Sequence, residues 1–305
     1  MKTSLLIVML LFSGATALGQ INMADSTAQV ISYWNKGEKQ SYTVSTQSIK
    51  IRNADTTARY LTSYDVEVTV LDSNATSYTM EWLCKNFKTT HANTTFQKVM
   101  EITKNLKVIY KTNELGVFEG VENWKEIQSY IKNAVVGIGE DFKNVPGSNE
   151  VLKQIVGTYS TKEAIETAAV KDILQLHSFN GIKYKLNEVI EATIKVPNIY
   201  GGEPFDSDIT AWLDEINSED NNIIVRSKQA VNVDQLTEAT YSYLLLMAQN
   251  MKVSPPRRDE IKDLKNEFLT ASRIHGSGWV IYSIQTTTIV SDNVTNVEER
   301  IIEIM

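Results

Sequence analysis

The chain has 305 residues, a formal net charge of −7 and 42% hydrophobic side chains. This hydrophobic fraction can bury a substantial core, which excludes an intrinsically disordered chain. The acidic balance argues against a nucleic-acid-binding surface, because contacts with the phosphate backbone require clustered basic residues. The single cysteine, Cys84, excludes a scaffold held by intramolecular disulfides. We expect Cys84 to be a buried small hydrophobic residue and not a nucleophile.

The first twenty residues have the order of a secretory signal peptide. Lys2 gives a positive start, an unbroken apolar run follows, and small residues come next. This run is far shorter than the roughly 20 residues that a membrane-spanning helix needs, so we expect no membrane-spanning segment. Cleavage is predicted near Ala17 or Gly19, which makes residues 1–19 the signal peptide and residues 20–305 a single domain. No cysteine stands at the cleavage site to carry a lipid anchor, and a periplasmic or extracellular location is predicted.

Alternation of apolar and polar side chains is the dominant pattern in the first half of the chain. It is clearest in residues 64–70, which read Tyr-Asp-Val-Glu-Val-Thr-Val. A period of two predicts a strand with one face toward a core and the other toward water. Strands are predicted at residues 40–52, 64–70, 77–86, 106–111 and 117–121.

A helical block follows these strands. Asn123 and Glu126 have the spacing of a capping box, and apolar residues then recur at helical intervals. Ser160 and Glu163 form a second capping box before another amphipathic run. Residues 150–156, between the two, predict a short helix.

The rest of the chain predicts further strands around one more helix. The helix, residues 234–251, has an apolar face formed by Leu236, Thr240, Tyr243, Leu244, Met247 and Met251. The strands are predicted at residues 183–196, 209–216, 223–231, 268–274, 279–290 and 297–304. About ten strands and three main helices without regular β-α-β alternation argue against a parallel nucleotide-binding sheet. We therefore predict an α+β fold in which a large, curved, mainly antiparallel sheet has the helices packed on one face.

Motifs for catalysis or metal binding are incomplete in this sequence. His91, His177 and His275 stand far apart and form no H-E-x-x-H motif. Ser277 lies between two glycines but lacks the full G-x-S-x-G pattern, and residues 137–139 lack the rest of a phosphate-binding fingerprint. The acidic clusters match no calcium loop and single out no glycosidase pair. We therefore predict no catalytic residue, no metal and no cofactor.

Large aromatic and aliphatic residues are spread over the predicted strands and helices. Core packing is their ordinary role, but part of a concave sheet face can also form a ligand pocket. The residues predicted to line such a pocket are Tyr64, Val66, Val68, Tyr78, Met80 and Trp82 from strands, with Tyr243 and Met247 from the last helix.

Two segments carry a resemblance to known proteins. Residues 110–116, Tyr-Lys-Thr-Asn-Glu-Leu-Gly, run into residues 122–126, Glu-Asn-Trp-Lys-Glu. Together with the exported start that lacks a lipid-attachment cysteine, they resemble uncharacterised secreted proteins of Gram-negative, gut-type bacteria. The predicted architecture also resembles the curved half-barrels of periplasmic lipoprotein carriers and related lipid-binding proteins, where an antiparallel sheet wraps helices around an apolar cavity. That second resemblance concerns the fold alone and carries over no residue.

Three functions are compatible with these features. The first is an exported, soluble binding protein for an apolar ligand, a lipid or an acyl chain, without catalysis. The second is a structural or interaction module of the cell envelope with a protein or glycan partner. The third is a hydrolase, which would need a polar cleft where His275 or His177 meets carboxylates. An enlarged cavity would support the first function, and a filled core with an exposed aromatic patch would support the second.

Overall fold

The computed structural model describes residues 20–142, 148–168, 170–198, 200–262 and 264–305. The predicted signal peptide, residues 1–19, lies outside the described residues. Within them, fourteen strands form one large and one small sheet. The small sheet has the order β1-β2-β8, with β1 at Ile21–Asn22, β2 at Thr27–Gln29 and β8 at Lys183–Lys185.

The large sheet is antiparallel, with the strand order β7-β6-β5-β4-β3-β14-β13-β12-β11-β10-β9. Neighbours in this order are consecutive in sequence except where β14 pairs with β3, which joins the end of the chain to its beginning. The strands are β3 (Lys39–Arg52), β4 (Asp55–Ser73), β5 (Ser77–Thr89), β6 (Lys107–Asn113), β7 (Phe118–Val121), β9 (Val189–Val196), β10 (Phe205–Asn217), β11 (Asn222–Val231), β12 (Lys265–His275), β13 (Val280–Ser291) and β14 (Val294–Ile304).

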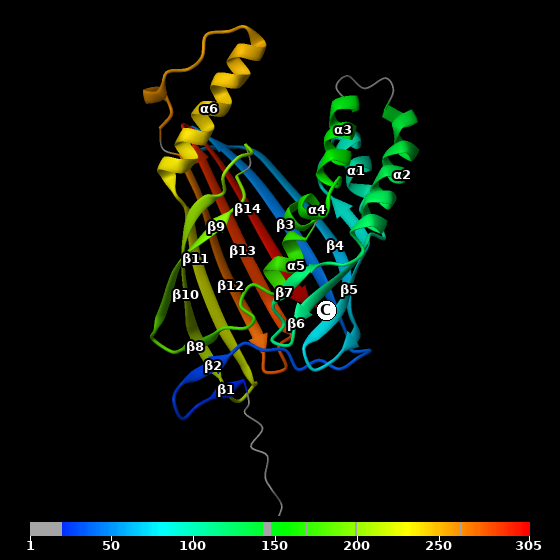
Figure 1. Ribbon diagram of the computed structural model, residues 1–305, viewed down its shortest axis with the longest axis vertical. Coiled ribbons are helices and arrows are strands. Elements are labelled where there is room, and N and C mark those ends of the chain that lie inside the picture. Colours follow the sequence, from blue (N-terminus) through cyan, green and yellow to red (C-terminus); the bar gives the residue numbers. More distant parts are fainter. Residues whose placement is uncertain (1–19, 143–147, 169, 199, 263) are drawn as a thin grey trace, which may run out of the picture.

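The sheet curves into an open trough with helices on one face (Figure 1). Helices α1 to α5 gather on the side of β3 to β7, and α6 projects from the opposite part of the sheet, beyond the strand ends. Their bounds are α1 (Thr94–Glu101), α2 (Trp124–Phe142), α3 (Ser148–Thr158), α4 (Lys162–Ala168), α5 (Lys171–Leu176) and α6 (Val233–Met251), with a short 3-10 helix at Arg258–Glu260. The predicted α+β fold, a large curved antiparallel sheet with helices on one face, is confirmed. The described helices include none with the length and apolar character needed to cross a membrane.

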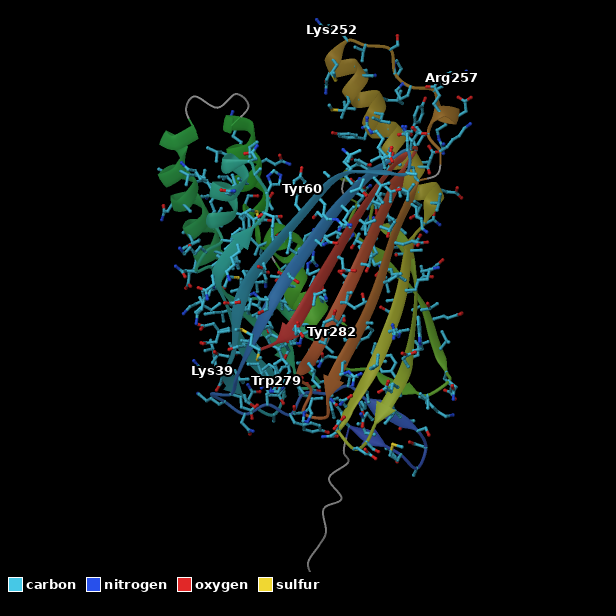
Figure 2. The ribbon with its side chains drawn as sticks, turned by 180° about the vertical axis from the view of Figure 1, so that it is seen from behind. Lys39, Tyr60, Lys252, Arg257, Trp279 and Tyr282 are labelled. Atoms are coloured by element: carbon cyan, nitrogen blue, oxygen red, sulfur yellow. The ribbon has the colours of Figure 1, made fainter. Side chains whose placement is uncertain are left out.

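The main core lies where the concave face meets helices α2, α4 and α5. Inward side chains of adjacent strands pair across the sheet, such as Tyr42 with Val66 and Val68 with Trp82, and all four are buried. Ile127 and Ile131 of α2 and the apolar residues of α5 pack onto this layer. Alternation therefore sends every second residue of a strand into the core and leaves the residues between them on the convex face. Figure 2 shows this helix-free face from behind, with Tyr282 on it.

Several local predictions differ from the structure. The strand predicted at residues 183–196 is divided into β8 and β9, because Asn187 adopts a left-handed conformation, with φ of 65°, that interrupts an extended chain. The run after Ser160 is divided into α4 and α5, and the Thr161 hydroxyl accepts from the Ala164 N–H, so the cap lies one residue later than predicted. At α2, the Glu126 N–H donates to the backbone carbonyl oxygen of Asn123. The side-chain amide oxygen of Asn123, which was predicted to cap the helix, accepts instead from the Ile109 N–H at 2.8 Å and ties this helix to β6.

Helix α6 is only partly covered by the rest of the described chain. Leu236 is buried in a separate small core with Phe205, Val231 and Leu264. Farther along the helix, Leu246 is 55% exposed and Met251 is 65% exposed. Lys252 and Arg257, just beyond the helix, lie at the tip of this projection in Figure 2. The apolar face of α6 thus extends beyond the sheet that covers its first turns.

Substitutions in α5 and α6 should therefore differ in their effect on stability. Ile173 of α5 is 1% exposed, and Ile173→Ala should lower the free energy of unfolding by about 3 kcal/mol, the usual cost of such a core truncation. Leu246→Ala on the exposed part of α6 should change it by less than about 0.5 kcal/mol. Urea unfolding of both variants measures this difference. Equal losses would show that α6 is packed in solution.

Candidate functional site

A cavity of about 560 Å³ lies between the helices and the concave face of β3, β4, β5 and β14. It opens to solvent on one side and reaches down to the main core. The described residues that line it are Thr46, Ser48, Tyr60, Thr62, Tyr64, Trp82, Cys84, Lys85, Phe87, His91, Met100, Thr103, Lys104, Leu106, Val108, Tyr159, Lys171, Asp172, Glu298 and Arg300.

One wall of the cavity is apolar. Trp82 of β5 and Leu106 and Val108 next to it are buried at its base. Phe87 at the far end of β5 and Met100 of α1 continue this wall toward the opening. Helix α1 follows β5 directly in the chain, which brings its side chains over this edge of the sheet. The result is a surface suited to hydrocarbon or aromatic groups.

The other wall consists of polar side chains in register on neighbouring strands. Arg300 of β14 stands opposite Thr46 of β3, which stands opposite Thr62 of β4. Two residues along the strands, Glu298 stands opposite Ser48. Because a strand returns to the same face every second residue, these side chains form two adjacent rows of the concave face.

Arg300 holds two carboxylates in a cluster at the base of this polar wall. Its Nε lies 2.9 Å from Asp172 Oδ1, and its Nη2 lies 2.6 Å from Glu298 Oε1. The Tyr64 hydroxyl donates to the other oxygen of Asp172. Burial, together with the adjacent Asp172 carboxylate, raises the pKa of Tyr64 well above its usual value, so the phenol stays protonated. The side chain of Arg300 is only 9% exposed.

This cluster also fixes α5 on the sheet. Asp172 is the second residue of α5, and one turn later Gln175 donates from Nε2 to the Arg300 carbonyl oxygen at 3.3 Å and to Ser283 Oγ at 3.1 Å. The helix is therefore held to β14 and β13 by both charged and neutral contacts. A short helix has little stability of its own, so its position depends on such tertiary contacts.

The opening of the cavity is formed by exposed and half-exposed residues. The rings of Tyr60 and His91 stack there with centroids 4.1 Å apart. Lys104, in the turn before β6, and Lys171, the first residue of α5, are both exposed and line the same cavity.

Cys84 lies half-buried in the cavity wall. Burial, reinforced by the negative charge of Asp172, raises the pKa of its thiol to about 12. A thiol with this pKa is protonated at neutral pH, and the thiolate is the nucleophilic form. Cys84 therefore acts here as a small apolar surface.

The residues predicted from sequence to line a pocket are divided by the structure. Tyr64 and Trp82 line the cavity, while Val66, Val68 and Met80 are buried in the core beside it. Tyr78 lies toward the opposite end of β5 and donates to the Ser32 carbonyl oxygen at 2.9 Å. Tyr243 of α6 stacks on Tyr200, with ring centroids 5.0 Å apart. Neither Tyr243 nor Met247 is among the described residues that line this cavity. The role of these residues in ligand binding stays a prediction.

The polar side of the cavity was not predicted from the sequence. Arg300 has the same strand parity as Ile302 and Ile304, which face the core. That parity was the available signal that a charged residue points inward. Asp172 gave no such signal, because its partners are 108 or more residues away in sequence.

A second, shallower depression lies at the base of α6. It has a volume of about 640 Å³ and is lined by Lys195, Asn198, Glu203, Pro204, Phe205, Gln235 and Ala239. Lys195 already contacts Asp206 at 2.6 Å, and Gln235 donates to the same carboxylate. Lys195 and Gln235 are thus engaged in contacts within this part of the fold.

The histidines do not gather into one site. His177 is buried, with Nδ1 2.8 Å from the Gly116 carbonyl oxygen and Nε2 3.0 Å from the Tyr110 hydroxyl. Since a carbonyl can only accept, Nδ1 carries the proton and Nε2 accepts from Tyr110. His275 lies 2.8 Å from the Ser277 hydroxyl within its own hairpin. Among the described residues, no three His, Cys, Asp or Glu side chains are placed to hold a metal ion.

Comparison with known proteins finds a distant structural likeness to a solved structure. No protein-family model and no curated protein sequence matches this chain, so the resemblance to secreted proteins of gut-type bacteria stays a prediction. A solved structure concerned with lipid–protein interactions in lipovitellin aligns with 90% of this chain at a TM-score of 0.40 and 9% identity. The chain spans about a quarter of that protein's solved chain, since the alignment covers 25% of it. A likeness of this degree assigns neither a family nor a ligand.

Removal of Arg300 should be costly because it leaves two carboxylates without their partner. Arg300→Gln is expected to lower the free energy of unfolding by about 3 kcal/mol, as for other broken buried ion pairs. Arg226 provides a matched control, because its 2.7 Å contact with Asp214 joins two side chains that are more than a third exposed. Arg226→Gln should cost less than about 1 kcal/mol. Chemical denaturation of both variants decides the point, and similar losses would contradict a structural role for the Arg300 cluster.

His177 should make stability depend on pH. Burial lowers the pKa of its imidazole to about 4 in the folded chain, against about 6.5 when unfolded. Between these values only the unfolded state binds the proton, so stability falls as pH falls, by up to about 3 kcal/mol in total. Above pH 6.5 this contribution is fully present, and below pH 4 no more is lost.

The variant His177→Gln isolates this effect from that of the carboxylates. Glutamine can still donate to Gly116 and accept from Tyr110 but does not titrate. Unfolding free energies measured from pH 4 to 7 should therefore fall less steeply in the variant than in the wild type. Identical slopes would rule out the buried neutral imidazole.

Proposed function

We propose that this protein binds the apolar chain of a lipid or acyl compound in the cavity between β3, β4, β5, β14 and the helices. The observation that carries the proposal is the apolar wall of Trp82, Phe87, Met100 and Leu106 around about 560 Å³. Binding apolar groups there removes them from water, at about 0.8 kcal/mol per methylene. In this function the protein binds the ligand without catalysing a reaction on it.

The size of the cavity limits the ligand. Small-molecule sites usually measure roughly 300–1,000 Å³, and this cavity falls within that range. At roughly 30 Å³ for each water-sized group, about 560 Å³ accommodates fewer than about 20 such groups. This fits a single acyl chain with a small polar end, and part of a two-chain lipid would remain outside.

The titratable groups around the cavity support binding without catalysis. Cys84 is held as a thiol and Tyr64 as a phenol by burial and by Asp172. The Asp172 and Glu298 carboxylates are both engaged by Arg300. Groups arranged in this way stabilise one another and position α5.

The proposal includes export of the protein to the periplasm or the extracellular space. Its support is the signal-peptide pattern of residues 1–19. In that location the protein would meet membrane-derived acyl compounds outside the cytoplasm.

A second candidate function is that of an envelope interaction module. The observation that favours it is the exposed apolar surface of α6 and the residues after it, which comprises Tyr243, Leu246, Met247, Met251 and Val253. Exposed patches of this kind occur at protein–protein interfaces.

Filling the cavity should weaken binding of an apolar chain. Thr62 lines the cavity, and its neighbour Ser63 points to the convex face of the same strand. Thr62→Trp should displace at least two methylenes of a bound chain, at about 1.6 kcal/mol or roughly tenfold in affinity. Ser63→Trp adds the same side chain outside and should leave affinity unchanged. Binding is measured by displacement of the neutral fluorophore N-phenyl-1-naphthylamine with dodecanol.

Native mass spectrometry of protein purified from its native host provides an independent measurement. A co-purifying acyl compound that is present in the wild type and in Ser63→Trp, but reduced in Thr62→Trp, is the expected result. A wild-type protein that binds neither the fluorophore nor any lipid would reject the proposal and favour the interaction module.

A further inference from the structure

We propose that the ligand carries an anionic end group, a carboxylate or a phosphate, which Lys104 and Lys171 hold at the opening of the cavity. The inference rests on the proposed function, because it assumes that an apolar chain occupies the apolar wall. It adds the chemical class of the other end of the molecule.

The charges around the cavity carry this inference. The lining contains four cations, Lys85, Lys104, Lys171 and Arg300, and two carboxylates, Asp172 and Glu298. Both carboxylates contact Arg300, at 2.9 and 2.6 Å. Lys85 contacts Glu67 on the convex face at 3.2 Å. The cavity is therefore positive overall, in a chain whose formal net charge is −7.

Lys85 and Arg300 form ion pairs, and Lys104 and Lys171 are the other two cations of the lining. Within the described chain, neither has a carboxylate oxygen within ion-pair distance, and every acid of the lining is already engaged. Both lysines are exposed, so their ammonium groups are hydrated in the absence of a ligand. An anionic group at the opening would replace water around them without breaking an existing ion pair.

The two lysines approach the cavity from different elements. Lys104 follows α1, and its neighbour Asn105 donates from its backbone N–H to the Cys84 carbonyl oxygen at 3.1 Å, which fixes this turn against β5. Lys171 begins α5 and precedes Asp172, whose carboxylate is held by Arg300. Both backbone positions are thus anchored to the walls of the cavity, while the side chains stay free to adjust. Each ammonium group can donate a charge-assisted hydrogen bond to a carboxylate or a phosphate.

The same arrangement disfavours the opposite charge. A cationic end group would meet Lys104 and Lys171 with no free carboxylate to receive it, because Asp172 and Glu298 already contact Arg300. A neutral end group can accept a hydrogen bond from either lysine but gains no ion pair. For chains of equal length, affinity should therefore decrease from anion to alcohol to amine.

A matched set of ligands tests this order. Dodecanoate, dodecyl phosphate, dodecanol and dodecylamine, below their micellar concentrations, compete with N-phenyl-1-naphthylamine for the full chain. We expect the two anions to bind at least ~10-fold more tightly than the alcohol, and the amine to bind most weakly. The preference should shrink between ~20 and ~300 mM salt, because exposed charges are screened. Comparison of the two anions distinguishes a carboxylate from a phosphate, and inorganic phosphate alone should not displace the fluorophore.

Variants assign the preference to the two lysines. In K104Q/K171Q, the preference for dodecanoate over dodecanol should fall below ~2-fold, because the charge that discriminates them is gone. The control K132Q/K153Q removes the same charge from exposed positions on α2 and α3 outside the cavity lining, and should keep the full preference. Circular dichroism of both variants checks that each is folded.

The outcomes separate the two proposals. If dodecanol binds as tightly as dodecanoate, the anionic end group is rejected. If K104Q/K171Q keeps the preference, the role of the two lysines is rejected. In both cases the apolar-chain site stands. If none of the four ligands displaces the fluorophore from the wild type, the proposed function fails and this inference fails with it.

Discussion

The pairing of β14 with β3 is the constraint on which the rest of the structure depends. These strands lie at opposite ends of the chain, and their register places Arg300 opposite Thr46 and Ile302 opposite Val44. Without this pairing the sheet would be two separate hairpin series, one from β3 to β7 and one from β9 to β14. Joined, they make one curved surface long enough to hold a helical core and a cavity side by side. The cavity floor is built across this junction, because β3 and β4 supply its hydroxyl groups and β14 supplies Arg300 and Glu298.

The boundary between the core and the cavity follows a change of composition along the concave face. On β3 the inward residues change from Val44 to Thr46 and Ser48, and on β14 they change from Ile302 to Arg300 and Glu298. Helix α5 covers the apolar part of this surface, with Ile173 and Leu176 buried in the core. Asp172, one residue before Ile173, meets the polar part and binds Arg300. Burying an arginine and a carboxylate is unfavourable unless each is paired, so the helix and strand fix each other at this level and the space beyond them stays open.

Much of the fold could be predicted from the sequence, because alternation and capping are local signals. The strands around Tyr64 and the helix beginning at Trp124 are clear in the periodicity. The division of a strand at Asn187 and of a helix at Val170 was not predicted, because it depends on the elements that pack against each segment in the fold. Tyr64 and Trp82 could be proposed for the cavity because they are large residues on an apolar parity. The Arg300 cluster could not be assembled in the same way, because it requires the register between segments at opposite ends of the chain.

The two ends of the trough use polar groups in opposite ways. At the closed end, Trp34 stacks on Trp279 at 4.5 Å and meets His177 edge-on, and this imidazole is kept neutral by burial, between Tyr110 and Gly116. A neutral imidazole can be sealed from water when both ring nitrogens have hydrogen-bond partners, as those of His177 do. At the open end the polar groups are charged. Arg300 is buried there with its carboxylate partners, while Lys104 and Lys171 lie exposed to solvent. A molecule that is apolar along most of its length and charged at one end matches this change. The chain of such a molecule would face Trp82, Leu106 and Val108 at the buried base, and its charge would remain where water and the lysines meet.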